Sequence, residues 1–213
     1  ETKSVEDKKE SVHENKFRVL GESQRNYLHN YKIYYDVNQD EIPDVQGPEG
    51  LEAEIETARR LADQIPPGIR EKILCEKPIE IRHVNPINPF KPEKKPPIKY
   101  VWFRAIDALP DDMTAHHYLL AYASDFNLVG TALYPHGRTF WEPTIQMASL
   151  DHAMWFHRDF RMDDWLLYVC SSPNASRALG FNHGHIFSPD GKLVASTTQE
   201  GLIRYRGKRG KNN

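Results

Sequence analysis

Cysteines are scarce in this sequence, and long apolar runs and a leader segment are missing. Cys75 and Cys170 are the only two cysteines among 213 residues, and they lack the close spacing of metal-binding pairs. We therefore expect reduced thiols in an intracellular compartment. No stretch approaches the ~18 apolar residues of a membrane-spanning helix. No basic and apolar leader opens the chain, so we expect that the protein is not secreted.

The chain also lacks a large excess of charge of one sign. Its 28 Lys and Arg residues and 30 Asp and Glu residues give a formal net charge of -2. This balance argues against a dedicated nucleic-acid binder and against a protein of membrane surfaces. The charge is unevenly spread, because residues 1–78 hold 17 acidic and 12 basic side chains whereas residues 79–213 hold 13 and 16. The two parts are therefore expected to differ in structure.

Composition and proline spacing divide the chain into four predicted segments. Polar residues fill its start, and the first residue is Glu rather than Met, which is consistent with a piece of a longer protein. Apolar residues recur at helical spacing in 50–62, and a second short helix is predicted at 68–75. The four segments are a polar, largely disordered segment at 1–41, a linker with short helices at 42–78, one folded domain at 79–206 and a basic tail at 207–213.

The order of strand-like and helical patterns from residue 79 onward predicts the fold class. Residues 113–123 follow Asp112, a suitable helix N-cap, and their second half is apolar on every side. A helix without a polar face must be buried all round, so we expect it at the centre of the domain. This order predicts an α+β fold in which a curved antiparallel sheet wraps around a central buried helix. The expected strands cover 79–84, 100–106, 145–157, 165–172, 178–188 and 193–206.

Two polar residues interrupt the apolar pattern of this domain. Gln199 lies on the more apolar face of the last predicted strand, where an unmatched buried amide costs about 1–3 kcal/mol. Satisfaction of that amide by neighbouring backbone groups is the simpler, structural interpretation. Asp125 lies in the most apolar part of the chain. Its simpler interpretation is a cap, together with Ser124, for a second short helix over 126–133.

Ser149 is a third polar residue in an apolar setting, within a predicted strand rich in Met, Ala, Leu, Trp and Phe. A buried serine is most often a small core residue whose hydroxyl bonds a local carbonyl. The residues around it lack the Gly-x-Ser-x-Gly pattern of a nucleophilic serine. His152 has the opposite parity, so an extended strand would point it away from Ser149. The histidines lack the carboxylate or cysteine pattern of a metal site, so we expect no metal.

Several motifs occur together in the order and spacing of one known family. They are Ala-Tyr-Ala-Ser-Asp-Phe-Asn at 121–127, Pro-His-Gly at 135–137, Ser-Leu-Asp-His-Ala-Met-Trp-Phe-His at 149–157 and Gln-Glu-Gly at 199–201. Trp-Leu-Leu-Tyr at 165–168 and Asp-Gly-Lys-Leu-Val-Ala-Ser at 190–196 extend the match. The sequence resembles acyl-CoA thioesterase II over roughly residues 79–206. A weaker similarity at 42–49 matches the linker between that family's domains.

The resemblance implies a hotdog fold, in which a curved antiparallel sheet wraps around a long helix. The family has two such units, and this chain is similar to the second, whereas residues 1–41 are too short and too polar to form the first. By motif, the family's Asp, its Thr or Ser, and its Gln fall on Asp125, Ser149 and Gln199. The resemblance implies that these side chains activate water to hydrolyse an acyl-CoA thioester. No cofactor is implied, because CoA is part of the substrate.

The resemblance also implies partners and a location. Because the chain resembles only the second unit, we expect a homo-oligomer or pairing with a separate N-terminal hotdog unit. Acyl-CoA is the expected substrate, and neither a nucleic-acid partner nor a membrane span is expected. Members of the family act in bacterial cytoplasm or in peroxisomes, so we expect a peroxisomal or cytoplasmic location, although the final residues are not Ser-Lys-Leu.

Two alternatives to hydrolysis follow from the same residues. A hotdog hydratase acting on enoyl-CoA resembles its relatives through an Asp-x-Asn-Pro-x-His run, but here Leu128 and Val129 follow Asn127, so the Pro and the His of that run are absent. A catalytically silent acyl-CoA-binding or interaction module is the second alternative, because one unit alone could leave the cleft between units incomplete.

Overall fold

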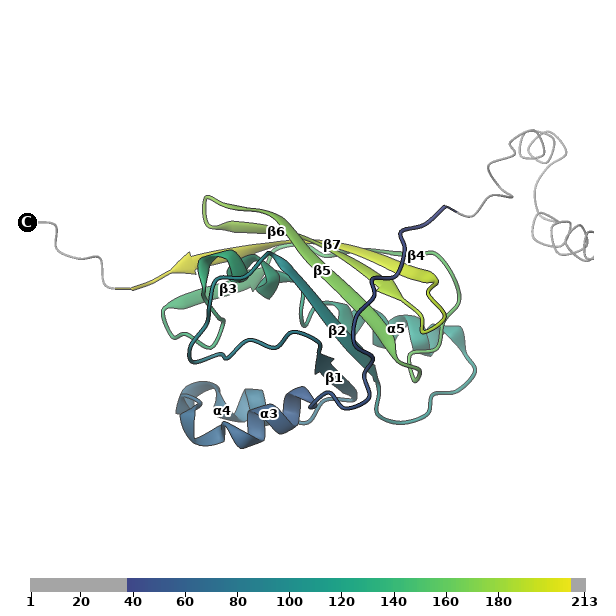
Figure 1. The fold of residues 1–213 in the computed structure, drawn as a ribbon, viewed down its shortest axis with the longest axis horizontal. Helices are drawn as coiled ribbons and strands as arrows, with labels where there is room; N and C mark the ends of the chain where they lie inside the picture. The colour runs from purple at the N-terminus through teal and green to yellow at the C-terminus, as the bar shows by residue number, and fades with distance from the viewer. Residues whose placement is uncertain (1–37, 208–213) are drawn as a thin grey trace, which may run out of the picture. The chain divides into compact units, whose positions relative to one another are not determined.

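The computed structural model describes residues 38–207 (Figure 1). The predicted polar segment at 1–41 and the basic tail at 207–213 therefore lie mostly outside the described residues. None of the helices within 38–207 is long and apolar enough to cross a membrane. The helices are α3 (Glu54–Arg60), η2 (Ala62–Gln64), α4 (Pro67–Leu74), α5 (Met113–Ser124) and η3 (Val129–His136), and the strands are β1 (Ile79–His83), β2 (Ile98–Ala105), β3 (Ile145–Ser149), β4 (Ala153–Phe156), β5 (Leu166–Ser176), β6 (Leu179–Phe187) and β7 (Leu193–Tyr205).

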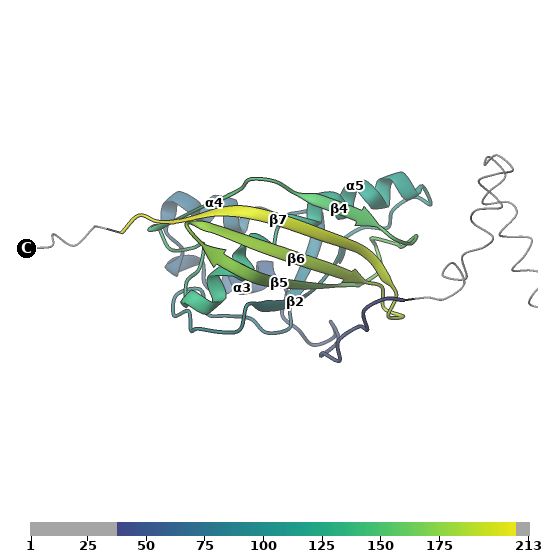
Figure 2. The ribbon, with the colours of Figure 1, turned by 90° about the horizontal axis from the view of Figure 1, so that it is seen from above.

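The strands form one antiparallel sheet in the order β1-β2-β5-β6-β7-β3, and β4 also pairs with β7. Figure 2 shows β5, β6 and β7 running side by side. The long β5–β6 and β6–β7 hairpins follow from alternating apolar residues separated by short turns. Gly191, with φ of 81°, supplies the left-handed conformation that the turn before β7 requires. The predicted α+β class with an antiparallel sheet is confirmed.

Helix α5 lies on one face of the sheet, which we call the inner face (Figure 1). Its first turn begins as predicted, because the Asp112 side chain accepts a hydrogen bond from the Thr114 amide. Leu120 and Ala123 pack against inner-face side chains of the strands. Burial of such apolar side chains removes them from water and stabilises the fold. The inner-face core members on the strands include Ile79, Ile81, Val101, Phe103, Leu166, Tyr168, Cys170, Ile186, Val194 and Ala195.

The prediction that this helix is buried all round is wrong. Tyr118 is 72% exposed and Tyr122 is 49% exposed, although both belong to the apolar run of α5. The buried residues His116, Leu120 and Ala123 recur at helical spacing, so only one side of α5 meets the sheet. On the other side of α5, the rings of Tyr118 and Tyr122 are exposed to solvent within residues 38–207.

The opposite, outer face of the sheet is covered by a segment that comes before β1. Trp102, Leu167 and Phe187 are buried there, and Ile42, Val45 and Leu51 pack against them. The Trp102 indole N–H donates to the Gln46 carbonyl at 2.8 Å. Part of the predicted linker at 42–78 is therefore bound to the sheet over its first ten residues.

Residues 145–157 do not form the single strand that the sequence predicts. Strand β3 pairs Ser149 with Gly201, whereas β4 pairs Ala153 with Thr198, so the register moves by one residue between them. At the break, the Asp151 carboxylate accepts the Glu200 amide at 2.7 Å in place of a backbone carbonyl. A bulge of this kind reverses which face the following side chains point to.

Candidate active site

Three side chains from distant parts of the chain meet at one carboxylate oxygen. Asp125 Oδ1 accepts a hydrogen bond from Ser149 Oγ at 3.0 Å and from Gln199 Nε2 at 2.5 Å. Asp125 follows the last residue of α5, Ser149 is the last residue of β3, and Gln199 lies in the middle of β7. The structure therefore brings together all three side chains of the predicted site. Their catalytic roles remain predictions.

The position of Asp125 follows from how α5 ends. Tyr168 OH donates to the Ser124 carbonyl at 3.0 Å, and Ser124 Oγ donates to the Ala121 carbonyl at 2.9 Å, which fixes the last turn. Burial raises the pKa of Tyr168, so its hydroxyl remains protonated and able to donate at neutral pH. A carboxylate at a helix C-terminus is disfavoured by the helix dipole, and the hydrogen bonds from Ser149 and Gln199 offset this electrostatic cost.

The simpler, capping interpretation of Asp125 is wrong. Its side chain caps no helix, and the next helical segment, η3, begins only at Val129 after Leu128. The interpretation of Ser149 as a small core residue is also wrong, because Ser149 is exposed and its hydroxyl reaches Asp125 rather than a local carbonyl. Both side chains are instead directed to a shared, solvent-facing position.

Glycine at position 201 lets β7 approach η3 closely enough to form this site. A Cβ at Gly201 would lie 2.4 Å from Val129 Cγ1, a distance that real carbon atoms do not tolerate. Gly201 is also the register partner of Ser149. Its missing side chain therefore permits the close contact of β7 with η3 at the position where β7 pairs with Ser149.

Gln199 is fully buried, as its place on the apolar side of β7 predicts. Its amide nitrogen donates to Asp125 rather than to the neighbouring backbone, so the structural interpretation of this residue is wrong. Its Oε1 has no hydrogen-bond donor among residues 38–207. A buried amide oxygen without a donor is costly and indicates a role that needs it.

His152 approaches the same turn, although strand parity predicts that it points away from Ser149. Its Nε2 lies 2.8 Å from Ser124 Oγ, next to Asp125. The bulge at Asp151 is the reason, because it changes the direction of the side chains that follow. Parity reasoning missed His152, and only the acidic residue inside the predicted strand could have signalled the break.

The buried Lys99 was also missed by sequence reasoning. Its ammonium donates to the Asn127 carbonyl at 2.9 Å and lies 5.2 Å from the centre of the Tyr134 ring. Burial lowers the pKa of Lys99. Thr131 Oγ1 donates to the same Asn127 carbonyl at 3.3 Å. These two donors fix the Asn127 carbonyl and thereby stabilise the turn that carries Asp125.

No group of three metal-binding side chains occurs among residues 38–207. His116, one of the histidines in the apolar helix, has a structural role. Its Nε2 lies 3.1 Å from the Pro110 carbonyl, and its Nδ1 accepts the Met162 amide at 3.0 Å. The expectation of no metal and no cofactor remains a prediction.

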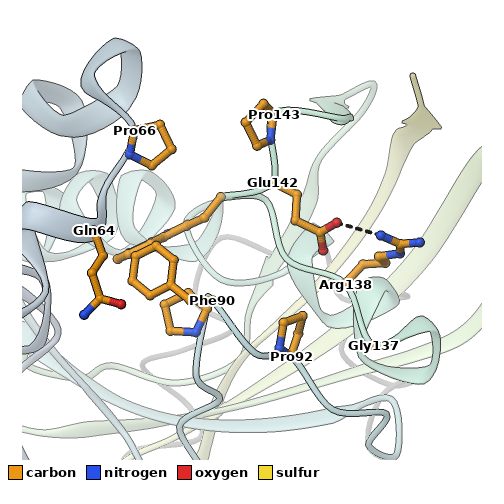
Figure 3. Close-up of a pocket in the computed structure, with 10 residues that line it drawn as sticks. Gln64, Pro66, Phe90, Pro92, Gly137, Arg138, Glu142 and Pro143 are labelled. Atoms are coloured by element: carbon orange, nitrogen blue, oxygen red, sulfur yellow. Dashed lines mark hydrogen bonds and ion pairs between the residues drawn. The ribbon is translucent and has the colours of Figure 1, made fainter. Parts of the chain in front are cut away.

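A separate pocket of about 460 Å³ lies at the other end of β3 from Ser149 (Figure 3). Phe90 and Trp141 meet edge to face inside it, with ring centres 5.3 Å apart. On its rim, Arg138 pairs with Glu142 at 2.8 Å. It is lined by Gln64, Pro66, Pro89, Phe90, Pro92, Gly137, Arg138, Trp141, Glu142 and Pro143, none of which contacts the Asp125 carboxylate.

Comparison with known proteins identifies the family. The sequence profile described as acyl-CoA thioesterase matches residues 69–202. The chain belongs to the acyl-CoA thioesterase family. It is 39% identical over 168 residues to "Acyl-CoA thioesterase 2" of Haemophilus influenzae, a match that covers 79% of this chain and 59% of that protein. It is 42% identical over 133 residues to "Acyl-coenzyme A thioesterase 8" of Homo sapiens, which covers 62% of this chain and 41% of that protein.

Solved structures confirm the hotdog fold. An acyl-CoA thioesterase II, TesB2, from Mycobacterium marinum superposes with a TM-score of 0.60 at 38% identity and covers 80% of this chain and 58% of its own. A protein of Alicyclobacillus acidocaldarius described as having a hot dog fold superposes with a TM-score of 0.57 at 20% identity and covers 79% of this chain and 56% of its own. The chain thus spans between two fifths and three fifths of the length of these relatives.

Proposed function

We propose that the protein hydrolyses acyl-CoA thioesters to a free fatty acid and CoA, with water activated by Asp125, Ser149 and Gln199. The observation that carries this proposal is the meeting of the Ser149 hydroxyl and the Gln199 amide on one oxygen of an exposed carboxylate. The named relatives, which are acyl-CoA thioesterases, support the substrate class.

The geometry divides the work between the two oxygens of Asp125. Oδ1 accepts from both Ser149 and Gln199, which orients the carboxylate. No group of residues 38–207 donates to Oδ2, so this oxygen is available to accept a proton from water. Since the Ser149 hydroxyl proton is directed at Oδ1, its oxygen lone pairs are free to accept the second proton of that water. The water is thereby held for attack.

The reaction then needs no covalent enzyme intermediate. The oxygen of the activated water forms a bond to the thioester carbonyl carbon while one of its protons passes to Asp125 Oδ2. Collapse of the tetrahedral intermediate breaks the carbon–sulfur bond. The leaving thiolate takes the proton back from Asp125, which gives CoA and the carboxylic acid and restores the carboxylate.

Exposed aromatic residues beside this site support docking of a second hotdog unit. Tyr122 and Phe126 are 49% and 36% exposed, lie on α5 and the turn that follows it, and have their ring centres 4.7 Å apart. Large exposed apolar groups on neighbouring elements mark interaction surfaces. The occupant is a second copy of this chain or an N-terminal hotdog unit, and docking there would shield the Asp125 carboxylate from bulk water.

The variant Asp125→Asn tests the proposed mechanism. We expect a decrease of kcat of about 10²–10⁴-fold, because the amide cannot accept the proton of the attacking water. Thiol release from a panel of acyl-CoAs measures turnover, and circular dichroism checks folding. The matched control is Asp151→Asn, which keeps an oxygen acceptor for the Glu200 amide and should retain activity. Near-normal turnover of Asp125→Asn would reject the mechanism.

The silent acyl-CoA-binding module is the second candidate, and the exposed aromatic surface is the observation that favours it. Light-scattering mass combined with thiol release separates the two. Thiol release by a purified oligomer supports the enzyme, whereas tight acyl-CoA binding without release supports the module. A peroxisomal or cytoplasmic location remains a prediction for either one.

A further inference from the structure

A second buried amide lies directly beside Gln199 on the inner face of the sheet. Asn182 of β6 is the register partner of Gln199 on β7, and both side chains are 0% exposed. Directly opposed residues of an antiparallel pair point to the same face, with Cβ atoms about 4.5–5.5 Å apart. The two amides are therefore neighbours within the core of the domain.

The hydrogen bonds that each amide nitrogen donates fix the orientation of that amide. Asn182 Nδ2 donates to the Gly180 carbonyl at 3.0 Å and to the carbonyl of Gln199 itself at 3.3 Å. Gln199 Nε2 donates to Asp125. The oxygens of both amides, Asn182 Oδ1 and Gln199 Oε1, have no donor among residues 38–207. Two buried acceptors in register and without donors match the two protons of one water molecule.

Small residues create the room for this polar pair. Gly180 and Gly184, on either side of Asn182 in β6, face Ala132 and the Tyr168–Thr197 pair so closely that a Cβ would lie 2.7 Å and 2.2 Å from the nearest atoms. The strand therefore approaches η3 at Gly180 and the side chains of Tyr168 on β5 and Thr197 on β7 at Gly184, and Asn182 lies between the two glycines. A leucine or valine at this position would bury no polar group and would avoid the free-energy cost of desolvating an amide. We therefore infer that the asparagine has a functional role.

We propose that Asn182 is a positioning residue of the active site, which holds Gln199 through its main-chain carbonyl and through a water shared by the two amide oxygens. This inference rests on the proposed function for its catalytic consequence. Held in this way, Gln199 presents its nitrogen and not its oxygen to Asp125. Without Asn182, the amide of Gln199 is free to rotate, and its oxygen then repels the carboxylate that it should orient.

A double-mutant cycle tests this inference. Asn182→Leu, which has as many side-chain heavy atoms as asparagine but no polar ones, should lower kcat about 10-fold with little change in KM, the loss expected for one buried hydrogen bond. In a Gln199→Ala background the same change should have less than a 2-fold effect, because Asn182 acts through Gln199. Equal effects in both backgrounds, or unchanged kcat in Asn182→Leu, would overturn the inference. Asn182→Ala replaces the leucine variant if that variant does not fold.

The control is Ser172→Ala, a buried position of β5 whose hydroxyl donates to the Phe181 carbonyl at 2.9 Å and does not contact Gln199. It should lower stability without changing kcat. A readout independent of turnover is the side-chain amide signal of Gln199 in ¹⁵N spectra, assigned by its loss in Gln199→Ala. Asn182→Leu should shift or broaden this signal, and an unchanged signal would overturn the positioning role. Absence of thiol release from the wild type would reject the proposed function and leave the spectral test to decide on Asn182.

Discussion

The outer and inner faces of the sheet are completed in different ways. On the outer face, Trp102, Leu167 and Phe187 are covered by the chain itself, and the Trp102 indole finds its partner in Gln46. On the inner face, buried polar side chains lie among the apolar ones. They include Lys99, Asn182, Thr197 and Gln199.

The difference shows where stability and function reside. Burying an amide or an ammonium costs free energy unless its partners are supplied, and an apolar residue of the same size avoids that cost. The core side chains of the outer face are apolar or aromatic and carry little of this cost. The inner face buries several polar side chains close to the turn that carries Asp125. The polar groups there serve that turn, since Lys99 and Tyr168 donate to the carbonyls of Asn127 and Ser124.

The largest stability effect should come from the outer face. Trp102→Ala leaves a cavity between the sheet and residues 42–51, and we expect a loss of about 3–5 kcal/mol in the free energy of unfolding. Urea denaturation measures this loss. Trp155→Ala, at a tryptophan of β4 that is 52% exposed, is the matched control and should cost far less. Equal losses for both variants would contradict the role given to the outer cover.

An inner-face variant should separate stability from turnover. Tyr168→Phe leaves the buried Ser124 carbonyl without the Tyr168 donor, which we expect to cost about 1–3 kcal/mol and to lower kcat, because the end of α5 then holds Asp125 less firmly. Trp102→Phe is its partner on the outer face, since it keeps an aromatic ring but removes the donor to Gln46 together with part of the indole. Trp102→Phe should lower stability and leave kcat unchanged. A normal kcat in Tyr168→Phe would show that the two faces are not functionally distinct.

Much of this architecture could be predicted from the sequence. The strand-like segments predicted an antiparallel sheet and most of its strands, and the isolated polar residues Asp125, Ser149 and Gln199 stood out because apolar neighbours surround each of them. Their convergence could not be derived from pattern, since it depends on Gly201 admitting β7 against Val129. Only the resemblance to a known family linked the three.

Other features had no readable signal. The sequence of α5 predicts burial on all sides, because an apolar run has the same composition whether the domain's own sheet or a separate surface covers it. The bulge between β3 and β4 depends on Asp151 replacing a backbone acceptor for Glu200, a tertiary contact that periodicity does not show. The alternation of β2 places the Lys99 side chain on the inner face. Its acceptor, the Asn127 carbonyl, lies 28 residues away in the sequence, so the local pattern does not reveal it.

The attachment of α3 to β1 should depend on pH, because Glu54 of α3 lies 2.8 Å from His83 of β1. Burial alone would raise the pKa of Glu54, but the hydrogen bond from His83 and the charges of His83 and Lys77 outweigh it and lower the pKa to about 2. Because the pKa of the unfolded chain is higher, near 4.5, the stabilisation is present above pH 4.5 and is lost as the pH falls towards 2. Unfolding measured from pH 6 to about pH 2.5 should show a smaller decrease in Glu54→Gln than in the wild type. Parallel curves would refute this contribution.

The smallest effect is expected at the exposed aromatic side of α5. Tyr118 is 72% exposed and belongs to neither hydrophobic core cluster, so Tyr118→Ser should change the free energy of unfolding of the isolated unit by no more than about 0.5 kcal/mol. Light scattering should nevertheless detect weaker association, because Tyr118 lies one helical turn before Tyr122 on α5 and its ring extends the surface that we propose as a docking site. Exposed Tyr205, at the far end of β7, supplies the control Tyr205→Ser. Unaltered association in Tyr118→Ser would place the docking surface elsewhere and would leave α5 with apolar exposure that no partner explains.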